Sequence, residues 1–246
     1  MKAILLGATK GIGRAIGRQL AERGEDIFLL GRHAEELELS ARDLEIRSGR
    51  TSTIGTARCD LLAAETFDSA LNAAVKSMGS FDTVIITAAH FATQSHLEDD
   101  ERACRDLLLA NFTNTVLFCE KARKRLMSTG GGTLCVLSSV AGERGRKPVV
   151  LYGATKAGLS AYLEGLDHKF RNQGLVTVCV KPGFVKTGMT ASLSPPPFAG
   201  EPDGVARSII RAIDRKTPEI YTPGIWRWIL AVIRLLPRWL MRRLNF

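Results

Sequence analysis

Short runs of consecutive apolar residues alternate along the chain with longer segments in which apolar and charged residues recur at helical spacing. A short apolar run indicates a buried strand, and helix-periodic segments between such runs indicate helices that cover a parallel sheet on both faces. The charged segments 14–24 and 34–48 are predicted to be the first two helices. We therefore predict an α/β fold with seven parallel strands, within residues 2–7, 26–31, 51–59, 82–88, 132–139, 175–183 and 219–224.

The length and composition fit one domain with a substantial core. The chain has 246 residues, of which 45% are hydrophobic, and it shows no internal repeat or low-complexity segment. Residues 192–202, SLSPPPFAGEP, are the one long segment with loop composition. We expect a single doubly wound domain over residues 1–222, followed by a basic amphipathic extension over residues 223–246.

Cysteine usage and the lack of a long apolar segment predict a cytoplasmic protein. The apolar run at residues 3–6 is too short for a signal peptide, and no run approaches the ~18 residues that a membrane-spanning helix needs. No group of cysteines and histidines has zinc-ligand spacing, so we expect no metal site. The cysteines are odd in number and lie in apolar segments, which is typical of buried free thiols in a reducing compartment: Cys59, Cys104, Cys119, Cys135 and Cys179.

The formal charge of +9 is partly concentrated in residues 223–246, which hold five arginines and no acidic residue. Basic charge of this kind fits nucleic acid, an anionic membrane or an anionic substrate. Nucleic acid is the least favoured of the three, because no nucleic-acid-binding motif accompanies the charge.

The first predicted strand runs directly into a glycine-rich loop, GATKGIG, and an amphipathic helix follows. Glycines at this place allow a tight turn and let the backbone approach a pyrophosphate at the helix N-terminus. This order is typical of a Rossmann-type dinucleotide-binding fold, and the alternative is a structural turn that binds no ligand. The predicted cofactor-binding residues of the loop are Gly7, Thr9, Lys10, Gly11, Ile12 and Gly13.

The end of the second strand favours NADP(H) over NAD(H) as the cofactor. NAD-binding folds usually have an acidic residue there, which binds the ribose 2′-hydroxyl group. In this chain that position is Gly31, Arg32 follows it, and Lys10 lies in the glycine loop. Two cations without a carboxylate fit a 2′-phosphate, although ordinary solvated side chains would give the same pattern.

Ser139, Tyr152 and Lys156 form a candidate proton-transfer group. Ser139 ends the fifth predicted strand, and open α/β sheets bind ligands at the carboxyl ends of their strands. Tyr152 and Lys156 lie one turn apart on a predicted helix and therefore face the same side. A phenol with a pKa of about 10 is a poor acid–base group at neutral pH, but a nearby ammonium group lowers that pKa. The alternative is three polar residues on a solvated helix.

Four further motifs follow in order along the chain. They are Asp60 after the third strand, Asn111 in LLLANFTNTVLF, YGATK at 152–156 and KPGFVKT at 181–187. With the glycine loop and Ser139, this ordered set resembles the short-chain dehydrogenase/reductase family over nearly the whole chain.

The resemblance implies a role for each of these residues. Tyr152 would be the catalytic acid–base, Ser139 would orient the carbonyl group, and Lys156 would hold the nicotinamide ribose and tune the tyrosine. Asn111 would position a water molecule that relays protons to the lysine. Other strand ends would contact the cofactor, with Asp60 at the adenine and Val185 and Thr187 at the carboxamide; this set is Asp60, Ala88, Pro182, Gly183, Val185 and Thr187.

Two departures from the family pattern affect the expected cofactor wall. Leu6 precedes the first glycine, where the family often has threonine, and residues 87–90 read TAAH where the family has NNAG. We expect different local packing there without loss of activity, because the four predicted catalytic residues are present. A non-catalytic, cofactor-sensing relative is the rival interpretation.

The C-terminal half is similar to reductases that act on decaprenylphospho-β-D-erythro-pentofuranosid-2-ulose, a 2-keto sugar carried on a polyprenyl phosphate. The likeness rests on SSVAGERGRKPVVLYGATKAGL, KPGFVKTGMTASL and YTPGIWRWILAVIRLLPRWLMRRL. It implies an NADPH-dependent ketoreductase that acts on a lipid-linked 2-keto sugar. The alternative substrates are another lipid ketone, such as 3-ketosphinganine, and a β-ketoacyl thioester.

The basic extension is predicted to lie on an anionic membrane, which would place the protein peripherally on the inner membrane face. Tryptophans and arginines beside a modest apolar face suit a membrane interface, and Pro237 is expected to separate a first helix from a short segment at 238–246. A substrate lid and a subunit contact are the alternatives. The family resemblance also implies a homo-oligomer, a dimer or tetramer, that pairs through helices near 99–127 and 152–172, although a broad core-facing side would explain their apolar residues equally well.

Overall fold

Seven parallel strands form one sheet in the order β3-β2-β1-β4-β5-β6-β7. The computed structural model describes residues 1–191, 194–196 and 198–244. The α/β fold and all seven predicted strands are confirmed, and their ends differ from the predicted ones by no more than three residues. The strands are β1 (Lys2–Leu6), β2 (Asp26–Gly31), β3 (Ile54–Arg58), β4 (Thr83–Ile86), β5 (Gly132–Leu137), β6 (Leu175–Pro182) and β7 (Glu219–Thr222).

Each inner strand buries both of its faces, because successive side chains point to opposite sides of the sheet. In β1, Ala3 and Leu5 belong to one core, while Ile4 and Leu6 belong to the other, and all four are buried. This explains why the strands appear in the sequence as continuous apolar runs rather than as alternating ones.

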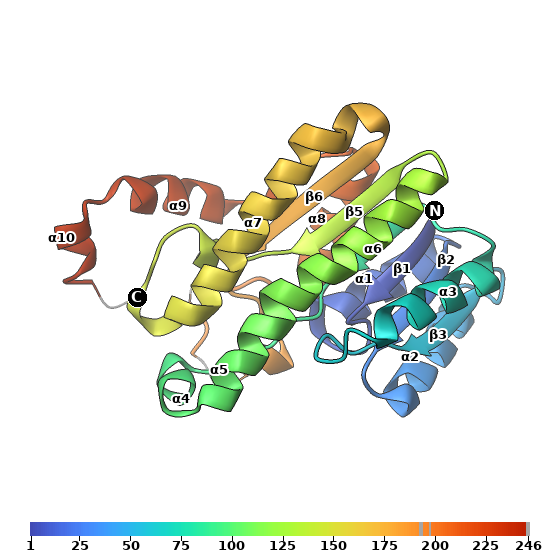
Figure 1. Ribbon diagram of the computed structural model, residues 1–246, viewed down its shortest axis with the longest axis horizontal. Coiled ribbons are helices and arrows are strands. Elements are labelled where there is room, and N and C mark those ends of the chain that lie inside the picture. Colours follow the sequence, from blue (N-terminus) through green and yellow to red (C-terminus); the bar gives the residue numbers. More distant parts are fainter. Residues whose placement is uncertain (192–193, 197, 245–246) are drawn as a thin grey trace.

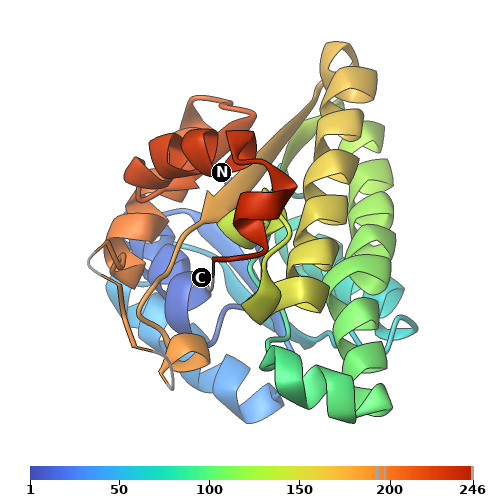
Figure 2. The ribbon, with the colours of Figure 1, turned by 90° about the vertical axis from the view of Figure 1, so that its left-hand side faces the viewer.

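Helices cover the two faces of the sheet (Figures 1 and 2). One core lies under α1 (Gly11–Glu22), α2 (Ala34–Arg47) and α8 (Pro202–Asp214). The other lies under α3 (Thr66–Met78), α6 (Asn114–Ser128) and α7 (Val150–Phe170). The predicted helices 14–24 and 34–48 correspond to α1 and α2.

The remaining helices frame the carboxyl edge of the sheet. The short helices α4 (Gln94–Asp99) and α5 (Glu101–Leu108) precede α6, and a π-helical turn, Leu109–Thr113, joins α5 to α6. Short 3₁₀ segments follow the same edge at Val140–Gly142, Lys147–Val149 and Gly188–Thr190, and another, Arg171–Gln173, ends α7. In the predicted loop 192–202, residues 192, 193 and 197 lie outside the described residues, and the rest up to Glu201 forms no helix and no strand of the sheet.

The C-terminal extension forms two helices, α9 (Ile225–Leu235) and α10 (Arg238–Met241), with Pro237 between them as predicted. The last two residues of the predicted segment 238–246 are outside the described part of the chain. Across the described ranges, no helix is both long and apolar enough to cross a membrane. The five cysteines are free thiols; four are buried as predicted, and Cys104 is half-buried.

Candidate active site

The loop between β1 and α1 has a shape that only glycine permits at two positions. Gly7 has a φ of 97° and Gly11 a φ of 52°, in the left-handed region that favours glycine. A Cβ atom on Gly7 would lie 2.5 Å from the amide nitrogen of Ala88, and a Cβ atom on Gly13 would lie 2.0 Å from the carbonyl oxygen of Gly7. The loop is therefore pressed against both the end of β4 and the first turn of α1.

The start of α1 has the features that a dinucleotide pyrophosphate needs. Lys10 precedes the helix in an extended conformation, and its side chain makes no capping hydrogen bond. The first amide groups of a helix lack partners within the helix and lie at the positive end of its dipole. An anion can approach them closely where the preceding loop is built of glycine. The residues present fit a dinucleotide cofactor at this position.

Arg32 and Lys10, the two cations predicted to bind a 2′-phosphate, contact different side chains. Arg32 follows β2, and its NH1 atom lies 3.4 Å from Nε2 of His90. Nζ of Lys10 lies 2.8 Å from Oε1 of Glu36 on α2, and the hydrogen bond from Lys10 lowers the pKa of that carboxyl group. Glu36 was not predicted as a site residue, because its position in a charged, solvated helix gives no sign of this contact. A carboxylate therefore competes for Lys10 with any incoming phosphate.

The end of β4 is fastened to the glycine loop by a threonine. The hydroxyl group of Thr87 donates to the carbonyl oxygens of Leu6 at 3.2 Å and Gly7 at 2.9 Å. The amide of Ala88 donates to Leu6 as well, at 3.1 Å. The structure thus places Ala88 beside the loop, and the hydroxyl group of Thr87 joins the end of β4 to that loop.

Asp60 lies after β3, at the same edge of the sheet. Its Oδ1 atom accepts a hydrogen bond of 3.0 Å from the amide of Leu62, and its backbone pairs with Ala63. The carboxylate stabilises this turn and remains half-buried.

The side chain of Asn111 is buried in the π-helical turn, and both of its polar atoms bind the backbone of one residue. Its Oδ1 atom accepts a hydrogen bond of 2.6 Å from the amide of His90, and its Nδ2 atom donates to the carbonyl oxygen of His90 at 2.7 Å. Asn111 therefore fixes the wall that follows β4, where the sequence departs from the family pattern.

Two serines follow the end of β5, and Ser138 attaches α7 to it. The hydroxyl group of Ser139 accepts a hydrogen bond of 3.1 Å from the amide of Ala141 at the start of a 3₁₀ turn. The hydroxyl group of Ser138 donates to the carbonyl oxygen of Lys156 at 2.8 Å and lies 2.7 Å from the Ser160 hydroxyl. Ser138 was not predicted as a site residue, although it precedes Ser139 directly.

Tyr152 and Lys156 face the end of β5 from the first two turns of α7. Nζ of Lys156 is buried, lies 5.7 Å from the ring centroid of Tyr152, and donates to the carbonyl oxygen of Leu137 at 2.8 Å. The ring of Phe91 packs edge-on against that of Tyr152, with 5.4 Å between centroids. The structure therefore brings together the three residues predicted to form the proton-transfer group.

Burial controls the protonation of both groups. It raises the pKa of Tyr152 to about 12, while a hydrogen bond with Ser139 opposes this shift. It lowers the pKa of Lys156 to about 8. The prediction that Lys156 lowers the pKa of Tyr152 is wrong for this structure, because desolvation of the phenolate dominates and the ammonium group is directed to Leu137. Tyr152 is consequently a neutral phenol at pH 7, which is the form that donates a proton.

The segment after β6 closes the other side of the site. A Cβ atom on Gly11 would lie 3.1 Å from the methyl group of Thr187, so Thr187 faces the glycine loop. Val185 is buried, so any contact of this residue with a cofactor would involve its backbone. Pro182 ends β6, and a Cβ atom on Gly183 would lie only 1.9 Å from Nε1 of Trp226. This contact with α9 was not predicted, because the two residues are far apart in the sequence.

Known proteins match the chain over most of its length. The family described as short chain dehydrogenase matches residues 1–197. An uncharacterized oxidoreductase of Streptomyces coelicolor is 32% identical over 251 residues, which cover 98% of this chain and 94% of that protein. An uncharacterized oxidoreductase of Mycobacterium tuberculosis is 27% identical over 241 residues, which cover 98% of this chain and 96% of that protein.

Solved structures share the fold. A short-chain dehydrogenase/reductase from Mycobacterium ulcerans superimposes with a TM-score of 0.81 at 19% identity, over 89% of this chain and 86% of that one. A variant of actinorhodin polyketide ketoreductase with NADPH has a TM-score of 0.77 at 22% identity, over 86% of this chain and 89% of that one. Because the family match spans most of the sequence and a relative with 32% identity aligns with nearly all of it, this protein belongs to the short chain dehydrogenase family and is an oxidoreductase that acts on CH–OH and C=O groups.

Proposed function

We propose that the protein is an NADPH-dependent ketoreductase in which Tyr152 gives a proton to the carbonyl oxygen of the substrate. One observation carries this proposal: Tyr152 lies at the carboxyl edge of the sheet as a neutral phenol, hydrogen-bonded to Ser139 and with Nζ of Lys156 5.7 Å from its ring centroid. A ketone that gains a hydride at carbon needs a proton at oxygen, and a positioned neutral acid supplies it.

Members of the family bind nicotinamide cofactors, and the glycine loop and the start of α1 would hold the pyrophosphate. The nicotinamide supplies a hydride when it is bound. NADP(H) is favoured by Arg32 and Lys10 at the expected 2′-phosphate position, and by the NADPH in the similar polyketide ketoreductase structure. Asp60, Ala88 and the segment from Pro182 to Thr187 would line the rest of the groove.

Each residue of the proton-transfer group has a distinct task. The hydroxyl group of Ser139 is oriented by the amide of Ala141 and is hydrogen-bonded to Tyr152, and it would donate its hydrogen to the carbonyl oxygen once the substrate is bound. Tyr152 gives up its proton, and Lys156, whose pKa is the lower of the two, would return a proton to the phenolate that forms. A lysine pKa of about 8 suits this exchange near neutral pH. Asn111 holds the wall through His90, and its main chain would contribute to the relay.

The substrate is proposed to be a lipid-linked ketone, with a 2-keto sugar as the leading candidate. We treat residues 1–222 as the catalytic domain and residues 223–246 as a separate basic extension. The extension supports a lipid-linked substrate because it suits a protein that works peripherally at a membrane. We also propose a homo-oligomer that pairs through α5, the π-helical turn, α6 and α7, which expose several large apolar side chains: Leu108, Phe112, Leu117 and Val150.

The proposal is tested by comparing Tyr152→Phe with Tyr162→Phe. Tyr162 lies on the same helix, and its hydroxyl group donates to Glu120 at 2.7 Å, away from the site. With a panel of soluble ketones, Tyr152→Phe should lower kcat by ~10²–10⁴-fold while NADPH binding is retained, because only the proton donor is lost. The Tyr162→Phe enzyme should keep its activity. A Tyr152→Phe enzyme that reduces ketones at the wild-type rate would show that another group is the acid.

A further inference from the structure

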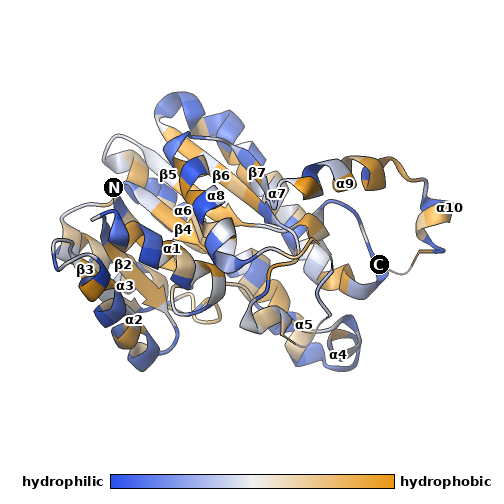
Figure 3. Ribbon diagram, turned by 180° about the vertical axis from the view of Figure 1, so that it is seen from behind, coloured by the Kyte–Doolittle hydropathy of each residue, from blue (hydrophilic) through white to orange (hydrophobic). Residues whose placement is uncertain are grey.

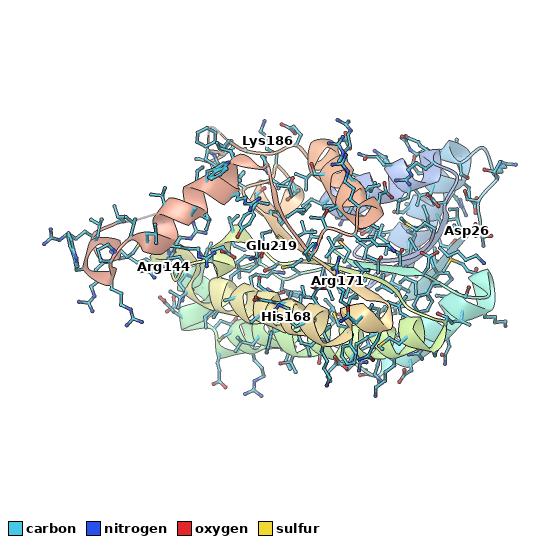
Figure 4. The ribbon with its side chains drawn as sticks, turned by 90° about the horizontal axis from the view of Figure 1, so that it is seen from above. Asp26, Arg144, His168, Arg171, Lys186 and Glu219 are labelled. Carbon is cyan, nitrogen blue, oxygen red and sulfur yellow. The ribbon has the colours of Figure 1, made fainter. Side chains whose placement is uncertain are left out.

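The helices α9 and α10 form an arm, residues 223–244, that leaves the molecule at its catalytic edge (Figures 1 and 2). The arm follows β7, which is parallel to β5 and β6. Its first residues therefore lie at the same edge of the sheet as Ser139 and Gly183. In Figure 4 the arm projects at one end of the molecule and Asp26, where β2 begins, lies at the other.

The inner side of the arm is attached to the catalytic domain at several points. Nε1 of Trp226 packs on Gly183, and Leu230 is buried. Arg234 contacts Oε2 of Glu143 at 3.3 Å, and Glu143 is itself buried and paired with Lys181 at 2.7 Å. These contacts explain how the arm is held in place.

A second attachment lies near the end of α9. The guanidinium group of Arg144 donates to the carbonyl oxygen of Leu236 at 2.7 Å, and Figure 4 shows Arg144 beneath the arm. Arg144 and Glu143 belong to the segment that begins with Ser139. The arm is thus tied to the loop that carries a proposed substrate-binding hydroxyl group.

The outer side of α9 is apolar although it is largely exposed. At 3.6 residues per turn, Ile225, Trp228, Val232 and Leu235 fall within about 80° of one another around the helix axis. Trp228 is 71% exposed, Val232 63% and Leu235 85%. Trp239 on α10 is 59% exposed. We call these five residues the outer stripe, and Figure 3 shows the hydrophobic colouring of α9.

The inner contacts of the arm are made by Trp226 and Leu230, whereas most of the surface of Trp228, Val232 and Leu235 is exposed. Contiguous exposed apolar residues on a folded protein mark an interaction surface. The question is which partner covers them.

The charge of the arm identifies the partner. Residues 223–244 contain five arginines and no acidic residue. Arg227, Arg238 and Arg242 are exposed and have no ion pair within the described chain, and Arg243 lies over the ring of Trp239 at 5.7 Å. A second copy of the arm would bring five more arginines to the same surface, which like-charge repulsion disfavours. A surface of anionic lipid head groups complements both the stripe and the arginines.

We propose that the outer stripe and the arginines of the arm dock this protein on an anionic membrane surface, with the catalytic edge of the sheet toward the lipid. Docking would let a ketone carried on a lipid reach Tyr152 while the lipid chain remains in the membrane, and this consequence rests on the proposed function. The docking itself requires neither cofactor nor turnover.

The three tryptophans of the chain, Trp226, Trp228 and Trp239, all lie in the arm, so tryptophan fluorescence reports on the arm alone. Full-length protein at low salt should co-sediment with vesicles of equal parts phosphatidylglycerol and phosphatidylcholine, and its emission should shift to shorter wavelength as Trp228 and Trp239 enter the interface. Vesicles of phosphatidylcholine alone should bind far less, and added salt should release the protein because it screens the arginines.

Matched variants separate the arm from general surface effects. Each arginine near an anionic surface contributes ~1 kcal/mol, so Arg238→Gln with Arg242→Gln should weaken binding by about 30-fold. Trp228→Ser with Trp239→Ser should abolish co-sedimentation. The control carries Arg42→Gln and Ile46→Ser on α2, where Ile46 is 72% exposed, and it should bind like the wild type.

Three results would overturn the docking proposal. The first is that the wild-type protein does not bind anionic vesicles, and the second is that the α2 control loses as much binding as the variants of the arm. The third is an emission shift that depends on protein concentration without vesicles, which would mean that a second copy of the chain covers the outer stripe. Reductase activity is measured separately with soluble ketones. An enzyme that binds vesicles but reduces no ketone would contradict the proposed function and leave the docking intact.

Discussion

Replacing Lys156 by methionine should make the protein more stable while it abolishes ketone reduction. Lys156 is only 2% exposed, and in the described chain its ammonium group makes one hydrogen bond, to the carbonyl oxygen of Leu137. Methionine has a similar length and no charge, so it would fill the same space. The substitution therefore removes a buried ammonium group without creating a large cavity.

The magnitude follows from the pKa of the lysine. Burial lowers it from 10.5 to about 8. One pKa unit corresponds to about 1.4 kcal/mol, so burying the protonated amine costs about 3 kcal/mol at pH 7. The folded pKa lies below the unfolded one, so this cost is fully present below pH 8 and disappears as the pH rises toward 10.5. Leaving the Leu137 carbonyl oxygen unsatisfied costs about 1–3 kcal/mol at every pH.

Urea unfolding of both proteins at pH 7 and pH 9.5 separates the two effects. The free-energy cost of the unsatisfied Leu137 carbonyl oxygen does not depend on pH. The cost of the buried charge in the wild type should fall from about 3 kcal/mol at pH 7 to about 1.4 kcal/mol at pH 9.5. The free energy of unfolding of the methionine variant, relative to wild type, should therefore drop by about 2 kcal/mol over this interval. Lys169→Met, on the same helix near its C-terminal end, is the control and should show no such change.

A difference in unfolding free energy that stays constant between pH 7 and pH 9.5 would refute the reasoning. It would mean that Lys156 titrates at its ordinary pKa and is not desolvated. A fall in activity would then have to come from lost contacts rather than from the proton relay.

Other predictions concern the cofactor side and the assembly. In steady-state assays kcat/KM for ketone reduction should fall above about pH 8, as Lys156 loses its proton, and a flat profile to pH 9.5 would contradict this. Gly183→Ala should push Trp226 out of place and shift tryptophan emission to longer wavelength; an unchanged spectrum would show that the clash is relieved elsewhere. Glu36→Gln should tighten NADPH binding several-fold, because it releases Lys10 for the 2′-phosphate, while Glu35→Gln, which removes no contact with Lys10, should not. Light scattering at micromolar concentration should report a dimer or tetramer, and a monomer would exclude the proposed pairing.

The fold was predictable because the parallel strands bury both faces and therefore appear as unbroken apolar runs. Leu5 and Leu6 point into different cores, yet both had to be apolar. The reactive group was predictable for a similar local reason, since Tyr152 and Lys156 are one turn apart on a helix.

The remaining features depend on contacts between distant segments. The ion pair of Lys10 with Glu36 and the packing of Trp226 on Gly183 leave no trace in either local sequence. The pKa of Tyr152 was predicted in the wrong direction because a spacing of four residues reveals a nearby amine but not the degree of burial.

The π-helical turn Leu109–Thr113 makes this part of the chain sensitive to its length, and not only to the identity of Asn111. A π turn holds one more residue than an α turn, so it rotates the helix that follows by about 100°. Phe118, Cys119 and Leu126 are fully buried in that helix only at this phase. Deleting Phe112, which is partly exposed, would turn the buried side chains of α6 away from the sheet and displace Asn111. Substituting Phe112 would leave the rotation of α6 about its axis unchanged. Relatives should therefore tolerate replacement of Phe112 but not single-residue insertions or deletions in this turn.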